Sequence, residues 1–455
     1  MNMLLRGGIV VSSKSSKRAD VLISGEKIIA IGKNIKTDAE VVDVTSKLLF
    51  PGFIDAHTHF DLEVSDTVTA DNFEFGTKSA IAGGTTTIID FATQNKGENL
   101  SCALNNWHVK AFSNSSCDYA FHMTVSDWNN DVKNELPAMF EQGVTSFKLY
   151  MTYPLMKLCD KEIFDILTQL KKLGGIAGVH CENAGIIDGL VEAKRSLNHM
   201  TVSSHPLTRP DYAEAEAVNR LLNIAYAVGT PVIIVHLSTK AALDEVVRAR
   251  ARGQKVYVET CPQYLLLDEE KYSLDISESS KYVCSPPVRK AVDRKSLWHA
   301  LKREEIQTVS TDHCSFTKEQ KGVGESDFTK VPNGMPGVET RGLLMYTYGV
   351  KKKRISVSQM CAYLSENPAK LYGMYPQKGA IKVGSDADIV IYDPRVKQVI
   401  KAENMHSKCD YSPFENVKVD GRIDSVYLRG HKVFDGKNIM NEKIGRYVSR
   451  GKFDL

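Results

Sequence analysis

Residues 48–59 read L-L-F-P-G-F-I-D-A-H-T-H, an apolar run that ends in two histidines one residue apart. Such a run, interrupted only by Pro51-Gly52, predicts a buried strand. Alternate residues of a strand point to the same side, so His57 and His59 can direct their imidazoles to one point. Two neutral imidazoles make half of a transition-metal site. An isolated pair is more often structural, so a metal site requires partners elsewhere in the chain.

Seven later segments have the same buried-strand character and alternate with helical stretches. The predicted strands are residues 85–90, 119–125, 145–149, 176–180, 232–236, 256–260 and 307–310. Amphipathic helices are predicted at residues 161–173, 212–227, 241–252 and 293–303. Alternating strands and helices indicate βα units, and eight of them predict an α/β protein with a closed, TIM-like (β/α)8 barrel.

A polar, chemically capable residue stands at or near the end of each predicted strand. In chain order these residues are His57, His59, Asp90, His122, Lys148, His180, His236, Glu259 and Asp312. The carboxyl ends of the strands of a (β/α)8 barrel converge on its catalytic face. The array therefore predicts a functional site at the barrel mouth, although each histidine alone would more often be an ordinary buried one.

Both ends of the chain consist of short apolar segments separated by serine, glycine and charged turns. The first three of these segments predict an antiparallel meander, and the same pattern returns near the C-terminus. Because chain termini often lie close together, the two ends can form one domain. We expect a small β-sandwich domain from residues 1–47 and 376–440, the barrel from residues 48–375, and a C-terminal tail from residues 441–455.

Composition fits a soluble globular enzyme, with 455 residues of which 42% are hydrophobic and 25% charged. The net charge of +3 is too small to indicate a nucleic acid or an anionic membrane as partner. Nine cysteines without short paired spacing argue against a disulfide framework or a zinc knuckle. With neither a signal peptide nor an apolar run of membrane-spanning length, the sequence predicts a cytoplasmic protein.

The predicted strand ends carry more histidines than a single catalytic zinc requires, since such a site uses three protein ligands. Two metal ions, roughly 3.5–4 Å apart, account for them more economically. Cations at that distance repel each other, so an anion must lie between them. Lys148 does not fit this scheme as an ammonium ion, because the two metal cations would repel it. Either it reaches solvent or pairs with Asp90 or Glu259, or it becomes an anion.

Asp312 follows the last predicted strand in the motif S-T-D-H-C. Its carboxylate could bind a metal through one oxygen while the other accepts and returns a proton. The alternative is an aspartate that caps a loop. His313 would point to the other side of a strand, and we leave it out of the predicted site.

Eight motifs, in this order, resemble the hydantoinase/dihydropyrimidinase branch of the amidohydrolase superfamily. They are G-F-I-D-A-H-T-H, S-F-K-L-Y-M-T-Y, V-H-C-E-N, V-H-L-S, V-E-T-C-P-Q-Y-L, C-S-P-P, S-T-D-H-C and P-N-G-M-P-G-V-E. The similarity continues to K-G-A-I-K-V-G-S-D-A-D-I-V-I-Y-D-P and D-Y-S-P-F-E, so it spans nearly the whole chain. It implies a homotetrameric hydrolase that opens 5-substituted hydantoins, aryl ones included, or dihydropyrimidines to N-carbamoyl amino acids. D selectivity is the expectation.

The resemblance also implies a site with two divalent metal ions, expected to be zinc, with manganese as the alternative. The implied ligands are His57, His59 and Asp312 for one ion, His180 and His236 for the other, and carboxylated Lys148 between them. A shared hydroxide would attack the ring carbonyl, and Asp312 would carry the proton to the leaving nitrogen. Tyr153 would bind the oxyanion, and main-chain groups of Ser285 and Asn333 would hold the cyclic amide.

One loop departs from the family pattern, in which M-P-F-G-G often follows H-T-H-x-D. Here Asp61 is followed by L-E-V-S-D, with Glu63 and Asp66 in place of apolar or glycine residues. We expect this loop to flank the exocyclic substituent of the substrate together with Tyr150 and residues 155–158, which leaves the preferred substituent open. The alternative is a loop tip that faces solvent.

Two other functions compete with this prediction. A dihydroorotase or allantoinase is disfavoured, because dihydroorotases resemble H-x-H-x-R and the position two after His59 is Asp61, an acid that would repel dihydroorotate. A metal-free, non-catalytic scaffold homologue is disfavoured because all six implied ligand positions are intact.

Overall fold

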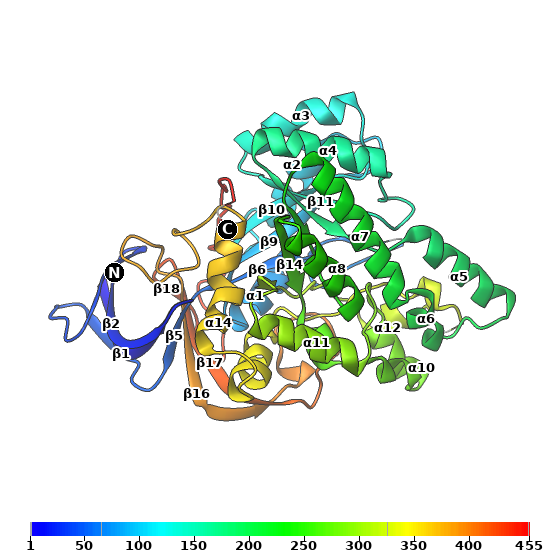
Figure 1. Ribbon diagram of the computed structural model, residues 1–455. Coiled ribbons are helices and arrows are strands. Elements are labelled where there is room, and N and C mark those ends of the chain that lie inside the picture. Colours follow the sequence, from blue (N-terminus) through cyan, green and yellow to red (C-terminus); the bar gives the residue numbers. More distant parts are fainter. Residues whose placement is uncertain (1, 65, 325, 454) are drawn as a thin grey trace.

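The computed structural model describes residues 2–64, 66–324, 326–453 and 455. Figure 1 shows a barrel of strands surrounded by helices, and beside it a sheet whose strands come from both ends of the chain. The predicted fold class is therefore confirmed, as an α/β protein with a parallel eight-strand barrel and a sheet built from N- and C-terminal strands.

The barrel strands are hydrogen-bonded in the order β15-β14-β13-β12-β11-β10-β9-β6, and all neighbours are parallel. They are β6 (Phe53–Thr58), β9 (Thr85–Thr93), β10 (Asp118–Thr124), β11 (Ser146–Tyr150), β12 (Ile176–His180), β13 (Val232–Ile234), β14 (Val256–Thr260) and β15 (Thr308–Val309). The ring closes where the chain after β15 meets β6, because the His59 amide donates to the His313 carbonyl at 2.8 Å. All eight predicted strands belong to this barrel, and their carboxyl ends share one mouth.

The first apolar run forms two strands, and the prediction of one continuous strand was wrong. β5 (Leu48–Pro51) pairs with β1 (Asn2–Val11) and β16 (Ile389–Val399) of the terminal sheet, whereas β6 enters the barrel. The chain changes sheets at Gly52, where a Cβ would lie 1.9 Å from Thr86 Oγ1. Only glycine permits so close an approach.

The terminal sheet combines both chain ends. Its order is β18 (His431–Phe434), β17 (Lys418–Leu428), β16, β5, β1, β2 (Ser16–Ser24) and β3 (Lys27–Gly32), with β4 (Glu40–Asp43) beside β1. The antiparallel strands β1, β2 and β3 are the predicted meander. Antiparallel pairing of β16 with β5 attaches the C-terminal strands to the N-terminal ones.

Helices cover the outside of the barrel (Figure 1). In α4 (Asp160–Leu173), the buried residues Ile163, Ile166, Leu167 and Leu170 recur at helical spacing, and the helix ends at Gly174 with φ 77°. The other α-helices are α1 (Phe73–Ala82), α2 (Leu100–Ala111), α3 (Asn130–Glu141), α5 (Ala184–Ser196), α6 (His205–Thr208), α7 (Asp211–Val228), α8 (Lys240–Ala251), α9 (Pro262–Leu266), α10 (Ile276–Ser279), α11 (Ala291–Lys302), α12 (Lys318–Gly322), α13 (Arg341–Leu344), α14 (Val357–Cys361) and α15 (Asn367–Leu371). Within the described ranges, no helix combines the length and apolar character needed to cross a membrane.

Two smaller features frame the barrel. A two-stranded hairpin of β7 (Glu63–Val64) and β8 (Thr67–Val68) follows β6. At the opposite end of the barrel, the C-terminal residues lie against the starts of β10 and β11, where Val448 N donates to Tyr119 O at 2.8 Å and Thr145 Oγ1 donates to Gly451 O at 2.8 Å.

Candidate active site

A cavity of about 390 Å³ opens at the carboxyl ends of the barrel strands. Every residue that the sequence singled out as a ligand or substrate contact lines it. These residues are His57, His59, Lys148, Tyr153, His180, His236, Ser285, Asp312 and Asn333. Residues scattered over more than half of the chain thus meet at one site.

Three of them form a compact group of potential metal ligands. Donor atoms of His57, His236 and Asp312 all lie within 4.8 Å of one another. Asp312 Oδ1 is 3.2 Å from His57 Nε2 and 3.1 Å from His59 Nε2. The His236 ring centroid is 4.6 Å from that of His180, which brings the fourth histidine to the same place. This His/Asp group can hold a metal ion.

The pKa values of the buried imidazoles favour metal binding over protonation. Burial is the main reason that the pKa of His57, His180 and His236 is lowered, with the charge of Lys148 acting in the same direction. Neutral imidazoles retain the lone pairs that a metal requires. For Asp312, the surrounding imidazoles outweigh the opposing effect of burial and lower the pKa well below its ordinary value.

Lys148 is buried, with 1% of its surface exposed, and the charged carboxylates that act on it are those of Asp312 and Glu259. Its Nζ lies 3.5 Å from His57 Nε2 and 5.0 Å from the ring centroids of both Phe91 and Tyr150. Burial lowers the pKa of the amine to about 8. The predicted alternatives, a lysine that reaches solvent or pairs with Asp90 or Glu259, do not describe this environment.

Two glutamates orient the histidines, and the sequence argument did not assign them that role. Glu259 Oε1 lies 2.6 Å from His57 Nδ1, which leaves Nε2 directed at Asp312. Glu182 Oε2 lies 2.7 Å from His180 Nε2 and accepts from Arg209 at 2.5 Å. A carboxylate behind a ligand histidine is a frequent companion of metal sites. The glutamate of V-H-C-E-N, two residues after His180, was the signal that could have found Glu182.

Two other strand-end residues serve the barrel wall. Asp90 accepts hydrogen bonds from Thr58 Oγ1 at 2.7 Å and Trp107 Nε1 at 3.0 Å. His122 lies 2.6 Å from Ser146 Oγ and 3.0 Å from Ala56 O. The regular array of strand-end residues therefore combines site residues with purely structural ones.

Three cavity residues adopt a backbone conformation that side chains disfavour. The φ angles are 69° at Tyr153, 39° at His236 and 52° at Asp312. Such left-handed geometry costs about 1–3 kcal/mol per non-glycine residue and concentrates at functional sites. It turns these side chains toward the cavity just beyond the strands.

Several polar atoms in and behind the cavity have no hydrogen-bond partner among the described residues. Buried side-chain atoms without a hydrogen-bond partner in the described chain include one each from His59, Glu182, His236, Glu259, Ser285 and Asn333. Such atoms are costly to bury and are usually matched by an ion, water or ligand. The arrangement fits a site completed by metal and substrate.

The lining of the cavity includes residues of the hairpin loop and of the segment after β11. Leu62, Glu63 and Val64 line it, as do Leu155, Met156 and residues 94–96. Of the residues predicted to flank the substituent, Glu63, Tyr150, Leu155 and Met156 line the cavity, whereas Asp66 and residues 157–158 lie outside its lining. Residues 94–96 were missed. Leu155 is 75% exposed, so the mouth presents apolar surface to an incoming group.

Asp61 does not take the position beside the substrate that the sequence predicted for it. Its carboxylate accepts from Phe73 N at 2.9 Å at the start of α1, and Asp61 is outside the cavity lining. It therefore does not repel an anionic substrate directly, as the sequence argument assumed.

Comparisons with known proteins agree with this geometry. Residues 48–433 match the sequence profile of the amidohydrolase family. The chain is 43% identical to D-hydantoinase of Geobacillus stearothermophilus, in an alignment covering 100% of this chain and 97% of the relative. The chain belongs to the hydantoinase/dihydropyrimidinase family.

Further relatives place this hydantoinase-family hydrolase within the same group. It is 38% identical to D-phenylhydantoinase of Escherichia coli (strain SE11), with 100% and 99% of the two chains covered. The solved structure of dihydropyrimidinase from Brevibacillus agri NCHU1002 superposes with a TM-score of 0.99 at 43% identity, covering 100% of both chains. The protein is a hydrolase that acts on cyclic amides, which decides against the scaffold alternative.

Proposed function

We propose that this enzyme opens the ring of 5-substituted hydantoins, dihydropyrimidines or both to N-carbamoyl amino acids, with D selectivity. The observation that carries the proposal is the single cavity in which every predicted ligand and substrate-contact residue meets. The names of its relatives, D-hydantoinase, D-phenylhydantoinase and dihydropyrimidinase, support this range of substrates.

The proposed cofactor is a pair of divalent ions, zinc or alternatively manganese. His57, His59 and Asp312 would hold one ion, His180 and His236 the other, with carboxylated Lys148 as the ligand common to both. When bound, the ions would act as Lewis acids that polarise the ring carbonyl and acidify the attacking water. Glu259 and Glu182 would keep His57 and His180 in the orientation that binding requires, through the contacts described above.

Carboxylation of Lys148 is favoured by its environment. Carbon dioxide reacts with a neutral amine, and an amine with a pKa of about 8 is neutral in about one molecule in ten at pH 7. An ordinary lysine, with a pKa near 10.4, is neutral in fewer than about one in a thousand. With two metal ions bound, the carbamate would place an anion between them where an ammonium would be repelled.

Tyr153 and Asp312 are the proposed catalytic side chains. Burial raises the pKa of Tyr153, so its phenol remains protonated and can donate to the oxyanion that develops on the ring carbonyl. The Asp312 carboxylate would take the proton of the attacking water and return it to the leaving ring nitrogen. Main-chain groups of Ser285 and Asn333, which also line the cavity, would hold the cyclic amide.

A substrate panel tests this proposal. Enzyme purified from cells grown with zinc is given dihydrouracil, hydantoin, D-phenylhydantoin and L-phenylhydantoin in separate reactions. Ring opening is followed by ultraviolet absorbance or by chromatography of the N-carbamoyl product. We expect turnover of at least one hydantoin or of dihydrouracil, and faster turnover of D-phenylhydantoin than of L-phenylhydantoin. Dihydroorotate is the control, and turnover of it equal to that of hydantoin would contradict the proposal.

Replacing Tyr153 by phenylalanine is expected to lower kcat by about 10²–10³-fold, because one oxyanion donor is lost. KM should change little, since the ring is held elsewhere. Tyr150→Phe is the matched control, because the Tyr150 ring lies 5.9 Å from that of Tyr153 and lines the same cavity. Steady-state kinetics of both variants decide the assignment, and equal effects would reject it.

We also propose that the enzyme is a cytoplasmic homotetramer. Sedimentation equilibrium should return four times the chain mass of 50.5 kDa. A monomer at micromolar concentration would exclude the tetramer without affecting the proposed chemistry.

A further inference from the structure

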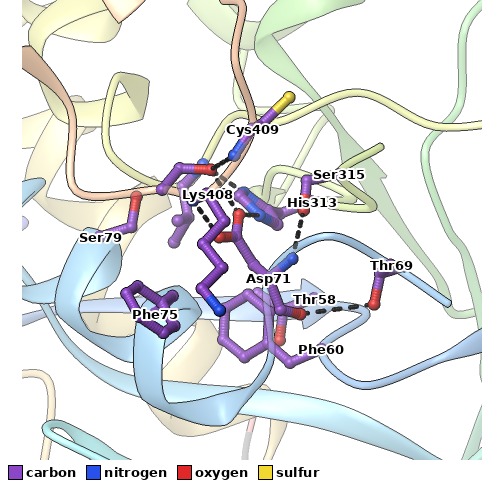
Figure 2. A network of polar contacts seen from close by, with 12 residues as sticks. Thr58, Phe60, Thr69, Asp71, Phe75, Ser79, His313, Ser315, Lys408 and Cys409 are labelled. Carbon is purple, nitrogen blue, oxygen red and sulfur yellow. Dashed lines mark hydrogen bonds and ion pairs between the residues drawn. The ribbon is translucent and has the colours of Figure 1, made fainter. Parts of the chain in front are cut away.

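The residue after Asp312, which the sequence argument set aside, lies at the centre of a buried polar network. Figure 2 shows His313 beside Asp71, with His313 Nε2 2.9 Å from Asp71 Oδ2. On the other side of the ring, the backbone amides of Gly337 and Val338 donate to Nδ1 at 3.1 and 3.2 Å. Because Nδ1 accepts, the proton is on Nε2 and is donated to Asp71. Both ring nitrogens are thus fixed.

Asp71 is fully buried and is itself held from several directions. Ser407 Oγ and Lys408 N donate to its carboxylate at 2.5 and 2.7 Å, and its own amide donates to Ser315 Oγ at 3.1 Å. Although burial alone would raise the pKa of Asp71, these hydrogen bonds, first that of His313, lower it. In Figure 2 the Lys408 side chain extends from this network to Phe75. The Asp71 carboxylate therefore connects three parts of the chain: the residues before α1, the residues after β15, and the segment between β16 and β17.

His313 also connects this carboxylate to the metal-ligand candidates through its main chain. Its carbonyl accepts from His59 N at 2.8 Å, and its amide donates to His57 O at 3.3 Å. Asp312, immediately before it, has the disfavoured φ of 52°. A residue in such a conformation keeps it only when its neighbours are firmly held. His313 is the neighbour that is held on both ring nitrogens and on both main-chain groups.

We propose that the Asp71–His313 pair is a positioning device for the reaction: by anchoring His313, it fixes the Asp312 carboxylate against His57 and His59. The inference rests on the proposed role of Asp312. Neither Asp71 nor His313 lines the cavity, so both act through Asp312 and are positioning residues.

Two isosteric variants of His313 separate the two halves of the network. In His313→Gln, the amide nitrogen can occupy the place of Nε2 and still donate to Asp71. In His313→Asn, the amide oxygen can replace Nδ1 as the acceptor for the amides of Gly337 and Val338. The shorter side chain offers no donor to Asp71. We expect His313→Asn and Asp71→Ala to lower kcat by about 10²-fold with KM within about threefold, as for a catalytic group displaced by about 1 Å. His313→Gln should remain within about tenfold of the wild-type kcat.

Metal retention supplies a readout that does not depend on turnover. The zinc-loaded proteins are dialysed against a chelator, and remaining zinc is counted by mass spectrometry. Zinc should leave His313→Asn and Asp71→Ala at least about tenfold faster than wild type, and His313→Gln at nearly the wild-type rate. His406→Asn is the matched control: His406 is in the same segment between β16 and β17 and binds Glu339 at 2.9 Å, and its loss should change neither kcat nor zinc release.

Three outcomes would overturn the inference. Wild-type kcat and zinc retention in folded His313→Asn and Asp71→Ala would remove the positioning role. Equal losses in His313→Asn and His313→Gln would show that the bond to Asp71 is not what matters. Failure of both asparagine and glutamine variants to fold, judged by circular dichroism, would assign the pair to stability alone. If Asp312→Asn is itself harmless, the proposed function fails first, so the two failures are distinguishable.

Discussion

Lys148→Ala is expected to lose bound metal and activity together. In the proposed site the amine becomes the anion shared by two ions, so its removal should leave fewer than one zinc per chain. Turnover should fall by roughly 10⁴-fold, because Lewis-acid stabilisation worth several kcal/mol is lost and each 1.36 kcal/mol is a factor of ten. Zinc content and hydantoin turnover are measured on the same preparation.

Two further expected results distinguish loss of the bridging anion from general damage to the site. Short-chain carboxylic acids should partly restore both zinc and turnover in Lys148→Ala, because a free carboxylate can occupy the space of the carbamate. Lys148→Met, which fills the same space without nitrogen, should lose metal and gain nothing from the acids. Lys172→Ala, which changes an exposed lysine in α4 outside the cavity lining, is the control and should behave as wild type. A Lys148→Ala protein with full metal and activity would exclude the bridging role.

Asp312→Asn is the second variant with a large expected effect. The amide preserves the shape of the side chain but cannot accept and return a proton, so kcat should fall by roughly 10³-fold or more. The carboxylate lies 3.1 and 3.2 Å from the Nε2 atoms of His59 and His57, and an amide is also a poorer metal ligand, so some zinc should be lost. KM for hydantoin should change much less than kcat.

The control for Asp312→Asn is Asp165→Asn, a change of the same type on the outer face of α4, where Asp165 pairs with Lys161 at 2.8 Å. It should leave kcat, zinc content and the melting temperature near their wild-type values. An Asp312→Asn enzyme that folds and retains more than about a tenth of the wild-type kcat would remove the proton-transfer assignment.

Periodicity in the sequence predicted the barrel well, because each strand is a short apolar run with a polar residue near its end. It could not show that the first run divides at Gly52. That division depends on Thr86 of a neighbouring strand, which approaches only in the folded barrel. The terminal sheet was predictable in outline, since short alternating segments at both ends must find partners.

Within the site, the sequence could identify residues that stand in motifs but not those that act through tertiary contacts. His57, His180 and His236 follow apolar runs and were identified from position. Asp71 stands in no motif, and its importance depends on His313, which lies 242 residues further along the chain. Conversely, Asp90 and His122 occupy the expected positions, but their side chains bind the barrel wall. Alternation along a strand predicts to which side of the sheet a side chain points. It does not predict which group that side chain will contact.

The measurement that bears on the whole scheme is a high-resolution crystal structure of protein purified with zinc and bicarbonate. We predict a branched, carbamate-shaped density on Lys148 Nζ, with one metal ion bound by His57, His59 and Asp312 and another by His180 and His236. A bare amine at position 148, with no ion among these histidines even after crystals are soaked in divalent salt and bicarbonate, would contradict it.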